Sequence, residues 1–240
     1  MPRSAVPRRD LLPRVRALAL RGGVSAWRRL AGDRVARLYH YDVILRTNNF
    51  DSTSWMGVPI WQNVLDLWTI QETIAELKPA LIVETGTHRG GSALFYAQLL
   101  DLIGGGRVLT IDIVDKRDHE HPRVSFLHGS STDPEIVAQV RAEAASTDGH
   151  VMVILDGDHS REHVAAELEL YAPLVSEGSY LLSQDGVIDQ VWFFGDTRPG
   201  PLPANREFLA RHPEFEYDAE RNERFGLTHH PLGWMRRREL

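Results

Sequence analysis

The sequence predicts an α/β fold with a seven-stranded, mostly parallel sheet, an antiparallel last strand and helices on both faces. Three observations lead to this prediction. Between residues 80 and 183, short apolar runs alternate with helical patterns, the order typical of a parallel sheet covered by helices. The run Ala80–Glu84 leads at once into a glycine-rich turn and a new helical pattern. Two more strand patterns follow near the end of the chain, which indicates an antiparallel pair at the sheet edge.

The composition excludes several classes of protein. Of the 240 residues, 42% are hydrophobic and 25% are charged, which is ordinary for a globular protein. The absence of cysteine excludes disulfides, thiolate catalysis and metal sites that are built from cysteine. No apolar run approaches the roughly 18 residues that a membrane span requires, so we expect a cytoplasmic protein without a membrane span.

Residues 1–50 form a basic arm. They hold eleven arginines against three aspartates, a net charge of +8, which leaves −14 for residues 51–240. Apolar residues recur at helical spacing on either side of Gly22-Gly23, so we expect two short basic amphipathic helices. The arm could pack onto the domain or onto a second subunit, or it could contact a membrane surface or an acidic partner. A nucleic-acid partner is not expected, because the rest of the chain is acidic.

Residues 51–240 are expected to form one domain, because no repeat or low-complexity linker interrupts them. Asn63 can cap a helix over 64–77, and Asp133-Pro134 can begin a helix over 135–145. The other expected helices are 92–102, 161–175 and 204–211. The expected strands are 80–84, 107–113, 124–128, 151–155, 179–183, 215–218 and 225–229. Five parallel strands with an antiparallel pair at one edge are the plan of the Rossmann-like Class I methyltransferases.

The glycine turn after the first of these strands carries information about the ligand. Gly86-x-x-x-Gly90-Gly91 does not match the dinucleotide fingerprint G-x-G-x-x-G. Glu84, which ends the strand, would repel a pyrophosphate, but it can pair with the amino group of a cationic, phosphate-free ligand. S-Adenosylmethionine is such a ligand, because it carries an α-amino group and a sulfonium. The turn therefore favours S-adenosylmethionine as the cofactor.

The next two strand ends fit the same ligand. Asp112 can accept hydrogen bonds from two ribose hydroxyls, although an acid at a strand end is often only a solvated cap. Gly129-Ser130-Ser131 follows the third strand, where an adenine ring would lie against backbone and small side chains. Acids and small residues at consecutive strand ends favour one nucleoside site. The expected cofactor-binding residues are Glu84, Gly86, Thr87, Gly90, Ser92, Asp112, Ser130, Ser131 and Asp156.

A second group of polar residues follows the fourth and fifth strands. Asp156 ends the fourth strand, and Gln184 and Asp185 end the fifth. The carboxyl ends of parallel strands are neighbours, so these side chains can converge on one point. Three oxygen donors with two negative charges suit Mg²⁺ better than a soft metal. Such an ion would hold a substrate hydroxyl, lower its pKa and orient its oxygen. The expected metal ligands are Asp156, Gln184 and Asp185.

His159 and Asp158 are the expected catalytic residues. His159 follows the first metal ligand by three residues and could take the hydroxyl proton near neutral pH. The alternative is that Asp158 or Ser160 caps the following helix and that His159 is a surface-loop residue. His163 is expected on the surface of that helix, and His229-His230 has no assigned role.

Four stretches of the chain resemble the cephalosporin hydroxylase family. They are Trp55-x-Gly57-x-Pro59, LKPALIVETGTHRGGSALF (77–95), VMVILDGDHSREHV (151–164) and ELYAPLVSEGSYLLSQD (169–185). The block LDGDHS is the most specific of them. The family also contains proteins named as rhamnosyl O-methyltransferases. The resemblance covers roughly residues 50–235 and leaves the basic arm outside it.

The resemblance implies the fold of S-adenosylmethionine-dependent methyltransferases, and a Mg²⁺ site similar to that of catechol and caffeoyl-CoA O-methyltransferases. It implies that the first metal carboxylate is Asp156 and that His159 takes the position of the catalytic lysine. The paired metal position falls on Gln184 and Asp185, where the family tends to have Glu-Asp and the catechol type Asp-Asn. Gln-Asp keeps the charge count of Asp-Asn but moves the amide, so a lower affinity for Mg²⁺ is expected.

These inferences predict a Mg²⁺-dependent O-methyltransferase that acts on a hydroxyl of a small secondary metabolite or a glycosyl group. Two alternatives remain open. One is the hydroxylase that the family name implies, which would need an oxygen-activating metal or a partner reductase. The other is a non-catalytic partner subunit that binds S-adenosylmethionine and has lost turnover through Gln184. The expected partners are a small-molecule hydroxyl acceptor and, because of the arm, a second copy of the chain in a homo-oligomer.

Overall fold

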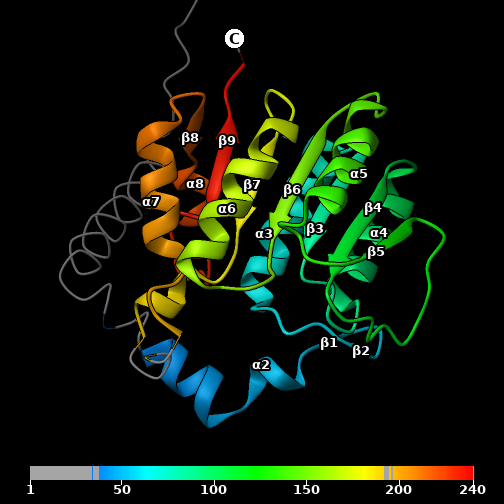
Figure 1. The fold of residues 1–240 in the computed structure, drawn as a ribbon. Helices are drawn as coiled ribbons and strands as arrows, with labels where there is room; N and C mark the ends of the chain where they lie inside the picture. Colours follow the sequence, from blue (N-terminus) through cyan, green and yellow to red (C-terminus); the bar gives the residue numbers. More distant parts are fainter. Residues whose placement is uncertain (1–33, 35–37, 192–194, 196, 240) are drawn as a thin grey trace, which may run out of the picture. The chain divides into compact units, whose positions relative to one another are not determined.

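The five predicted parallel strands are present and lie side by side in the order β5-β4-β3-β6-β7 (Figure 1). The structure is a computed structural model that describes residues 34, 38–191, 195 and 197–239. Its contacts divide the chain into two units, Met1–Thr47 and Asn48–Leu240. In the first unit the structure describes a π-helix, η2 (His40–Arg46), and the predicted helices of the basic arm lie for the most part outside the described residues.

The second unit contains one large sheet and one short hairpin. Because each of β3, β4, β5, β6 and β7 runs parallel to its neighbour, their carboxyl ends share one edge of the sheet. The large sheet consists of β3 (Leu81–Thr85), β4 (Arg107–Asp112), β5 (Val124–His128), β6 (Val151–Leu155), β7 (Tyr180–Ser183), β8 (Phe215–Tyr217) and β9 (Trp234–Arg237). The hairpin pairs β1 (Ser54–Trp55) with β2 (Val58–Pro59).

The antiparallel end of the sheet differs in part from the prediction. The strand predicted over 215–218 is confirmed as β8, but the strand predicted over 225–229 is wrong, because the last strand is β9. β9 lies between β7 and β8 and is antiparallel to both. Burial explains the difference: Trp234 and Met235 are fully buried on opposite faces of the sheet, whereas Phe225 is exposed.

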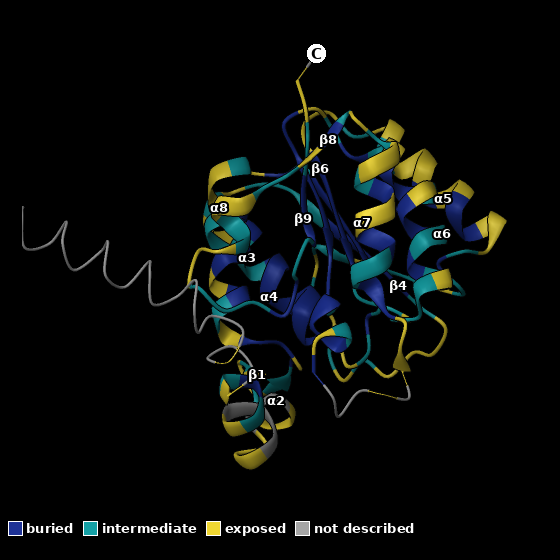
Figure 2. Ribbon diagram, turned by 90° about the vertical axis from the view of Figure 1, so that its left-hand side faces the viewer, coloured by how far each residue is buried: buried dark blue, intermediate teal, exposed yellow. Residues whose placement is uncertain are grey.

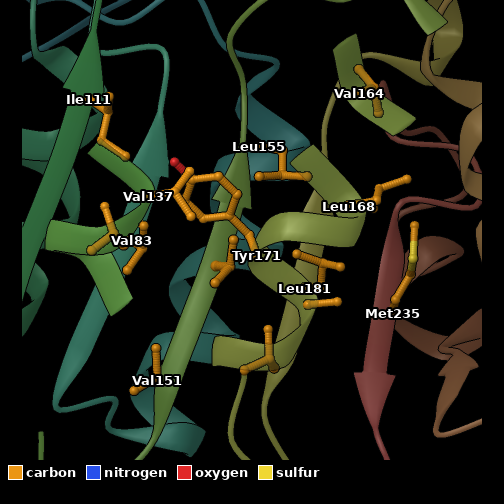
Figure 3. Close-up of a cluster of buried hydrophobic side chains, with 14 of the residues drawn as sticks. Val83, Ile111, Val137, Val151, Leu155, Val164, Leu168, Tyr171, Leu181 and Met235 are labelled. Atoms are coloured by element: carbon orange, nitrogen blue, oxygen red, sulfur yellow. The ribbon is translucent and has the colours of Figure 1, made fainter. Parts of the chain in front are cut away.

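Helices cover both faces of the sheet, as predicted. One face packs against α5 (Pro134–Ala145), α6 (Arg161–Tyr171) and α7 (Pro201–Arg211), and the other packs against α3 (Val64–Leu77) and α4 (Gly91–Ile103). Figure 2 shows the buried strands between these two helical layers. Figure 3 shows part of the hydrophobic core between the sheet and the layer of α5, α6 and α7. Shorter helices are α2 (Asn49–Ser52), α8 (Ala219–Asn222), η3 (Ala172–Leu174) and η4 (Gly186–Asp189).

Local chemistry sets the helix ends. Asn63 Oδ1 accepts a hydrogen bond from the Leu65 N–H, and Asp133 caps α5 with proline at the first turn, as predicted. α6 ends at Tyr171 instead of at residue 175, because Pro173 cannot donate the next helical hydrogen bond and the chain tightens into η3. No helix in the part of the chain that the structure describes has the length and apolar character of a membrane span.

The strand order reverses direction at the centre of the sheet, between β3 and β6. The chain leaves β3 toward β4 and β5, and later returns to place β6 on the other side of β3. The loops after β3 and β6 therefore diverge at the carboxyl edge, which is where ligands bind in open α/β sheets. The predicted cofactor and metal residues follow these strands.

Candidate active site

The glycine turn connects β3 to α4 and touches the loop after β6. Gly86 has φ +87°, and a Cβ placed on it would lie 1.9 Å from the carbonyl oxygen of Asp156. The Asp156 N–H donates to the Thr85 carbonyl at 3.0 Å, so the two loops begin side by side. Gly90, with φ +81°, precedes the first residue of α4. Only glycine allows the left-handed turn at Gly86 and this close approach at the same position.

We expect Gly86→Ala to destabilise the protein by about 3 kcal/mol or more, because the new methyl group meets backbone that has no room to move and the residue is also held at positive φ. Urea unfolding measures the loss. Gly104→Ala is the matched control: Gly104 also has positive φ, but a Cβ there meets nothing within 4 Å. The control should cost only about 1 kcal/mol. Equal losses in the two variants would show that the Gly86 contact is not decisive.

Glu84 lies fully buried beside the turn. Thr110 Oγ1 donates to Glu84 Oε2 at 2.6 Å, and Thr87 Oγ1 in turn lies 2.6 Å from Thr110 Oγ1. Glu84 Oε1 has no hydrogen-bond partner among the described residues. Burial raises the pKa of Glu84 to about 7, although the hydroxyls of Ser92 and Thr110 oppose the rise. A cationic amino group that met this carboxylate would supply the missing partner and favour its charged form.

Asp112, at the end of β4, is tied to the loops around it. Its Oδ2 accepts from the His88 N–H at 2.8 Å, and its Oδ1 accepts from the Val114 N–H at 3.0 Å. Each carboxylate oxygen can accept a second hydrogen bond, so both remain able to bind hydroxyl groups. The loop after β5 adjoins it, since the Gly129 N–H donates to the Asp112 carbonyl at 2.9 Å.

The remaining predicted cofactor residues differ in how accessible they are. Thr87 and Ser92 are buried, and the Thr87 hydroxyl is engaged with the Thr110 hydroxyl. Ser130 lies half-buried with its hydroxyl 3.0 Å from that of Thr132. Ser131 is buried and contacts His163, a residue that was expected on the helix surface. The cofactor roles of these side chains remain predictions.

The second predicted group comes together after β6 and β7. His159 Nε2 lies 3.9 Å from Asp156 Oδ1 and 3.4 Å from Asp185 Oδ2. One ligand atom from each of the three residues lies within 4.8 Å of the others, so they form a group that could hold a metal ion. Burial, and then the charge of Asp185, raises the pKa of Asp156. A cation at this point would relieve both effects.

Gln184 is almost fully buried against Asp156. Its Oε1 accepts from Gln62 Nε2 at 2.6 Å, and Gln62 Nε2 also donates to Asp156 Oδ2 at 2.8 Å. With its amide turned, Gln184 would donate to Asp156 Oδ1 at 3.0 Å and to Oδ2 at 3.1 Å. The same spacing suits two neighbouring oxygen ligands of an octahedral Mg²⁺, which with bonds near 2.1 Å lie about 3 Å apart. The donor set therefore fits Mg²⁺ when the Gln184 amide oxygen, and not its nitrogen, faces Asp156.

Asp158 is placed differently from the other predicted catalytic residue. It is exposed, and its Oδ1 accepts from the Ser160 N–H at 2.8 Å, just before α6 begins. This hydrogen bond lowers the pKa of Asp158. Ser160, the N-cap residue of α6, makes no side-chain cap hydrogen bond, so Asp158 orders the turn before the helix and does not cap it. His159 lies between the two carboxylates.

The sequence did not indicate the residues that brace Asp185. Asp185 has φ +57°, and its N–H donates to His230 Nδ1 at 3.1 Å. Asp66 on α3 is buried and accepts from the Thr228 hydroxyl at 2.6 Å and from the His229 N–H at 2.8 Å. Burial lowers the pKa of His229, which favours its neutral form. No local pattern reveals these contacts, because they join segments that are far apart in the sequence.

Comparisons with known proteins identify related chains. A family model described as Rhamnosyl O-methyltransferase/CmcI matches residues 47–238. Rhamnosyl O-methyltransferase of Mycobacterium tuberculosis is 38% identical over 212 residues, 85% of this chain and 85% of its own length. Its namesake in Mycobacterium leprae is 34% identical over 194 residues, 79% of this chain and 85% of its own length. A solved CmcI structure with Mg-SAM has a TM-score of 0.63 at 18% identity, over 80% of this chain and 78% of that chain. These findings confirm the predicted family and fold.

Proposed function

Because the chain belongs to the rhamnosyl O-methyltransferase/CmcI family and is therefore an S-adenosylmethionine-dependent O-methyltransferase, we propose that it methylates a glycosyl hydroxyl with the help of Mg²⁺. One observation carries the proposal. The ends of β3 and β4 hold the acids Glu84 and Asp112, and the adjoining ends of β6 and β7 hold Asp156 and Asp185 with His159 between them. A cationic nucleoside and a hydroxyl acceptor can therefore be held side by side.

The cofactor residues act by binding and orientation. The buried Glu84 carboxylate pairs with the ammonium group of the cofactor, and Asp112 accepts hydrogen bonds from its ribose hydroxyls. S-Adenosylmethionine supplies an electrophilic methyl group when it is bound. Methyl transfer needs little covalent chemistry from the protein, because the reaction depends mainly on holding the hydroxyl oxygen about 3 Å from the methyl carbon and in line with it.

The acceptor residues act on the hydroxyl. Asp156, Asp185 and the amide oxygen of Gln184 would hold Mg²⁺, whose charge lowers the pKa of a bound hydroxyl. His159 Nε2 accepts the hydroxyl proton, and the adjacent carboxylates of Asp156 and Asp185 stabilise the charged imidazole that results. Gln62 keeps the Asp156 carboxylate in place through its hydrogen bond.

A sugar acceptor is supported by an aromatic surface at the same site. Trp61 is 44% exposed and packs on the His88 ring with 4.3 Å between ring centroids. His88 in turn donates its backbone N–H to Asp112 Oδ2, so the indole lies near the proposed ribose site. The apolar C–H face of a deoxyhexose can pack on such a ring. This agrees with the names of the mycobacterial relatives.

The test is methyl transfer from radiolabelled S-adenosylmethionine to a simple rhamnoside. We expect incorporation into the sugar, and no incorporation into the matched rhamnoside whose hydroxyls are already methylated. Tight binding of S-adenosylhomocysteine without transfer to any hydroxyl acceptor would favour the non-catalytic alternative. Oxygen-dependent hydroxylation of the acceptor would favour the hydroxylase. The homo-oligomer, the cytoplasmic location and the absence of a nucleic-acid partner remain predictions.

Removal of the metal gives a direct prediction. In excess EDTA we expect methyl transfer to fall by at least about a hundredfold, because the loss of a Lewis acid costs several kcal/mol of transition-state stabilisation. Added Mg²⁺ should restore the rate, whereas Ca²⁺, which prefers longer bonds and more ligands, should restore it less. Binding of S-adenosylhomocysteine, measured by calorimetry, is the control and should change little. Full activity in EDTA would remove the metal from the mechanism.

A further inference from the structure

Glu167 is a buried acid for which the proposed reaction has no use. It lies in the middle of α6 with no exposed surface, and neither of its carboxylate oxygens has a hydrogen-bond partner among the described residues. His163 lies beside it, with its Nε2 3.4 Å from Glu167 Oε1. The position that a Cβ of Gly157 would take is 3.6 Å from this oxygen, so Glu167 lies beneath the loop that follows β6.

His163 connects Glu167 to Ser131, one of the predicted cofactor residues. His163 Nε2 lies 3.0 Å from Ser131 Oγ. Tyr171, one helical turn beyond Glu167, donates from its hydroxyl to the Ser131 carbonyl at 2.7 Å. Figure 3 shows the ring of Tyr171 within the core cluster, where the surrounding side chains fix it. α6 therefore holds both the side chain and the backbone of Ser131.

The position of the proton follows from these contacts. His163 Nε2 lies 3.4 Å from Glu167 Oε1 and 3.0 Å from Ser131 Oγ, and an ionised Glu167 favours the ring form that carries a hydrogen on Nε2. With that hydrogen in place, the shorter contact is a hydrogen bond that Ser131 Oγ accepts from His163. The Ser131 hydroxyl then keeps its own proton to donate, and among the described residues its oxygen is hydrogen-bonded only to His163. The nearby Glu167 carboxylate raises the pKa of His163, which strengthens its role as a donor.

The position of Ser131 indicates which group accepts a hydrogen bond from its hydroxyl. Ser131 comes two residues after Gly129, whose N–H donates to the Asp112 carbonyl, so it adjoins the proposed ribose site. A base that is attached to a ribose at Asp112 lies next to this loop, and adenine offers unprotonated ring nitrogens as acceptors. We propose that Glu167 and His163 are positioning residues that orient the Ser131 hydroxyl as a donor to a ring nitrogen of the cofactor's adenine. This inference rests on the proposed function.

The test compares binding of S-adenosylhomocysteine with binding of its 1-deaza, 3-deaza and 7-deaza analogues, in each of which one ring nitrogen is replaced by C–H. Calorimetry on the full chain measures all four dissociation constants. We expect the wild type to bind one analogue about tenfold more weakly than S-adenosylhomocysteine, the effect of one lost hydrogen bond. Ser131→Ala should bind that analogue and S-adenosylhomocysteine equally.

The positioning residues are tested by the same ratio of dissociation constants, which a purely structural role would not change. His163→Phe and Glu167→Leu should reduce the ratio to about threefold or less, because the hydroxyl is no longer oriented. His163→Gln is the matched variant: its amide can still donate to Ser131, and it should recover most of the preference. Thermal unfolding confirms that each variant folds, and Ser131→Ala carries the test if a helix variant does not.

The outcomes separate this inference from the proposed function. No preference in the wild type, or a preference that persists in Ser131→Ala, would overturn the inference while binding of S-adenosylhomocysteine still supports the function. An equal loss of affinity for all four ligands in both His163→Phe and Glu167→Leu would reduce the pair to a structural role. Failure of the wild type to bind S-adenosylhomocysteine would overturn both.

Discussion

Glu84→Gln is expected to abolish tight binding of S-adenosylhomocysteine and at the same time to raise the melting temperature of the ligand-free protein at pH 8. The loss of binding follows because a buried ammonium group would have no charged partner. Breaking such a pair costs roughly 3–5 kcal/mol, which corresponds to a dissociation constant at least about a hundredfold higher. Calorimetric titration measures the affinity, and calorimetric unfolding measures the melting temperature.

The gain in stability follows from the environment of Glu84. Burial raises its pKa to about 7, so the folded protein binds a proton that the unfolded chain, with an ordinary carboxyl pKa, releases. This group therefore stabilises the fold most at low pH, and the contribution is lost as the pH rises toward and through 7. At pH 8 the charged form costs about 3 kcal/mol, which neutral glutamine avoids. We expect the melting temperature to rise by roughly 5 °C or more.

The pH series provides the control for this variant. At pH 5 the wild-type carboxyl is neutral, so the two melting temperatures should converge. Cofactor binding should also depend on the protonation of Glu84, but it should weaken at low pH. Below pH 7 the affinity of the wild type should fall by about tenfold per pH unit, because Glu84 must lose its proton before the ammonium binds. The variant should show no such dependence. A variant that binds as tightly as the wild type would remove Glu84 from the cofactor site.

Much of the site could be predicted because parallel strands align their carboxyl ends. Glu84 and Asp112 lie near the ends of β3 and β4, and Asp156 lies just beyond the end of β6, so reading the strands also located their side chains at one edge. The predicted caps at Asn63 and Asp133 depend only on neighbouring residues and are confirmed. Local chemistry and a repeated strand geometry are thus sufficient for these features.

The features that the sequence did not reveal depend on long-range contacts. Gln62 reaches Asp156 across 94 positions, and His230 reaches Asp185 across 45. The sequence did not reveal the last strand because its apolar run, Trp234-Met235, is only two residues long. This run becomes a strand because β9 pairs with β7 on one side and with β8 on the other. Polar side chains such as Glu167 are indistinguishable from surface residues until the helix is packed.

The raised pKa values of Glu84 and Asp156 have a common origin. Each carboxylate is taken out of water before its cationic partner is bound, and each therefore destabilises the ligand-free protein. In the proposed function this cost would be recovered on binding, because a cofactor ammonium and a metal ion would pair with these charges. The proposed function thus assigns two cations to the site, one at the ends of β3 and β4 and one at the ends of β6 and β7.

Asp156→Asn separates these two cation sites. We expect methyl transfer to fall by at least about a hundredfold, because the variant loses a charged ligand of the metal and a charge that stabilises the protonated His159. Affinity for S-adenosylhomocysteine should change by no more than about threefold, since Glu84 and Asp112 remain. Single-turnover transfer from labelled S-adenosylmethionine to a rhamnoside measures the first effect, and calorimetry measures the second.

Asp148→Asn is the matched control, because Asp148 is an exposed carboxylate just before β6, at the opposite edge of the sheet. It should leave both quantities unchanged. The two cation sites share the Thr85–Asp156 contact, so a backbone shift in the variant would weaken cofactor binding as well. Full transfer by Asp156→Asn would exclude Asp156 as a metal ligand. An equal loss of transfer and cofactor affinity would instead mean that Asp156 acts mainly by supporting the loop beneath the cofactor.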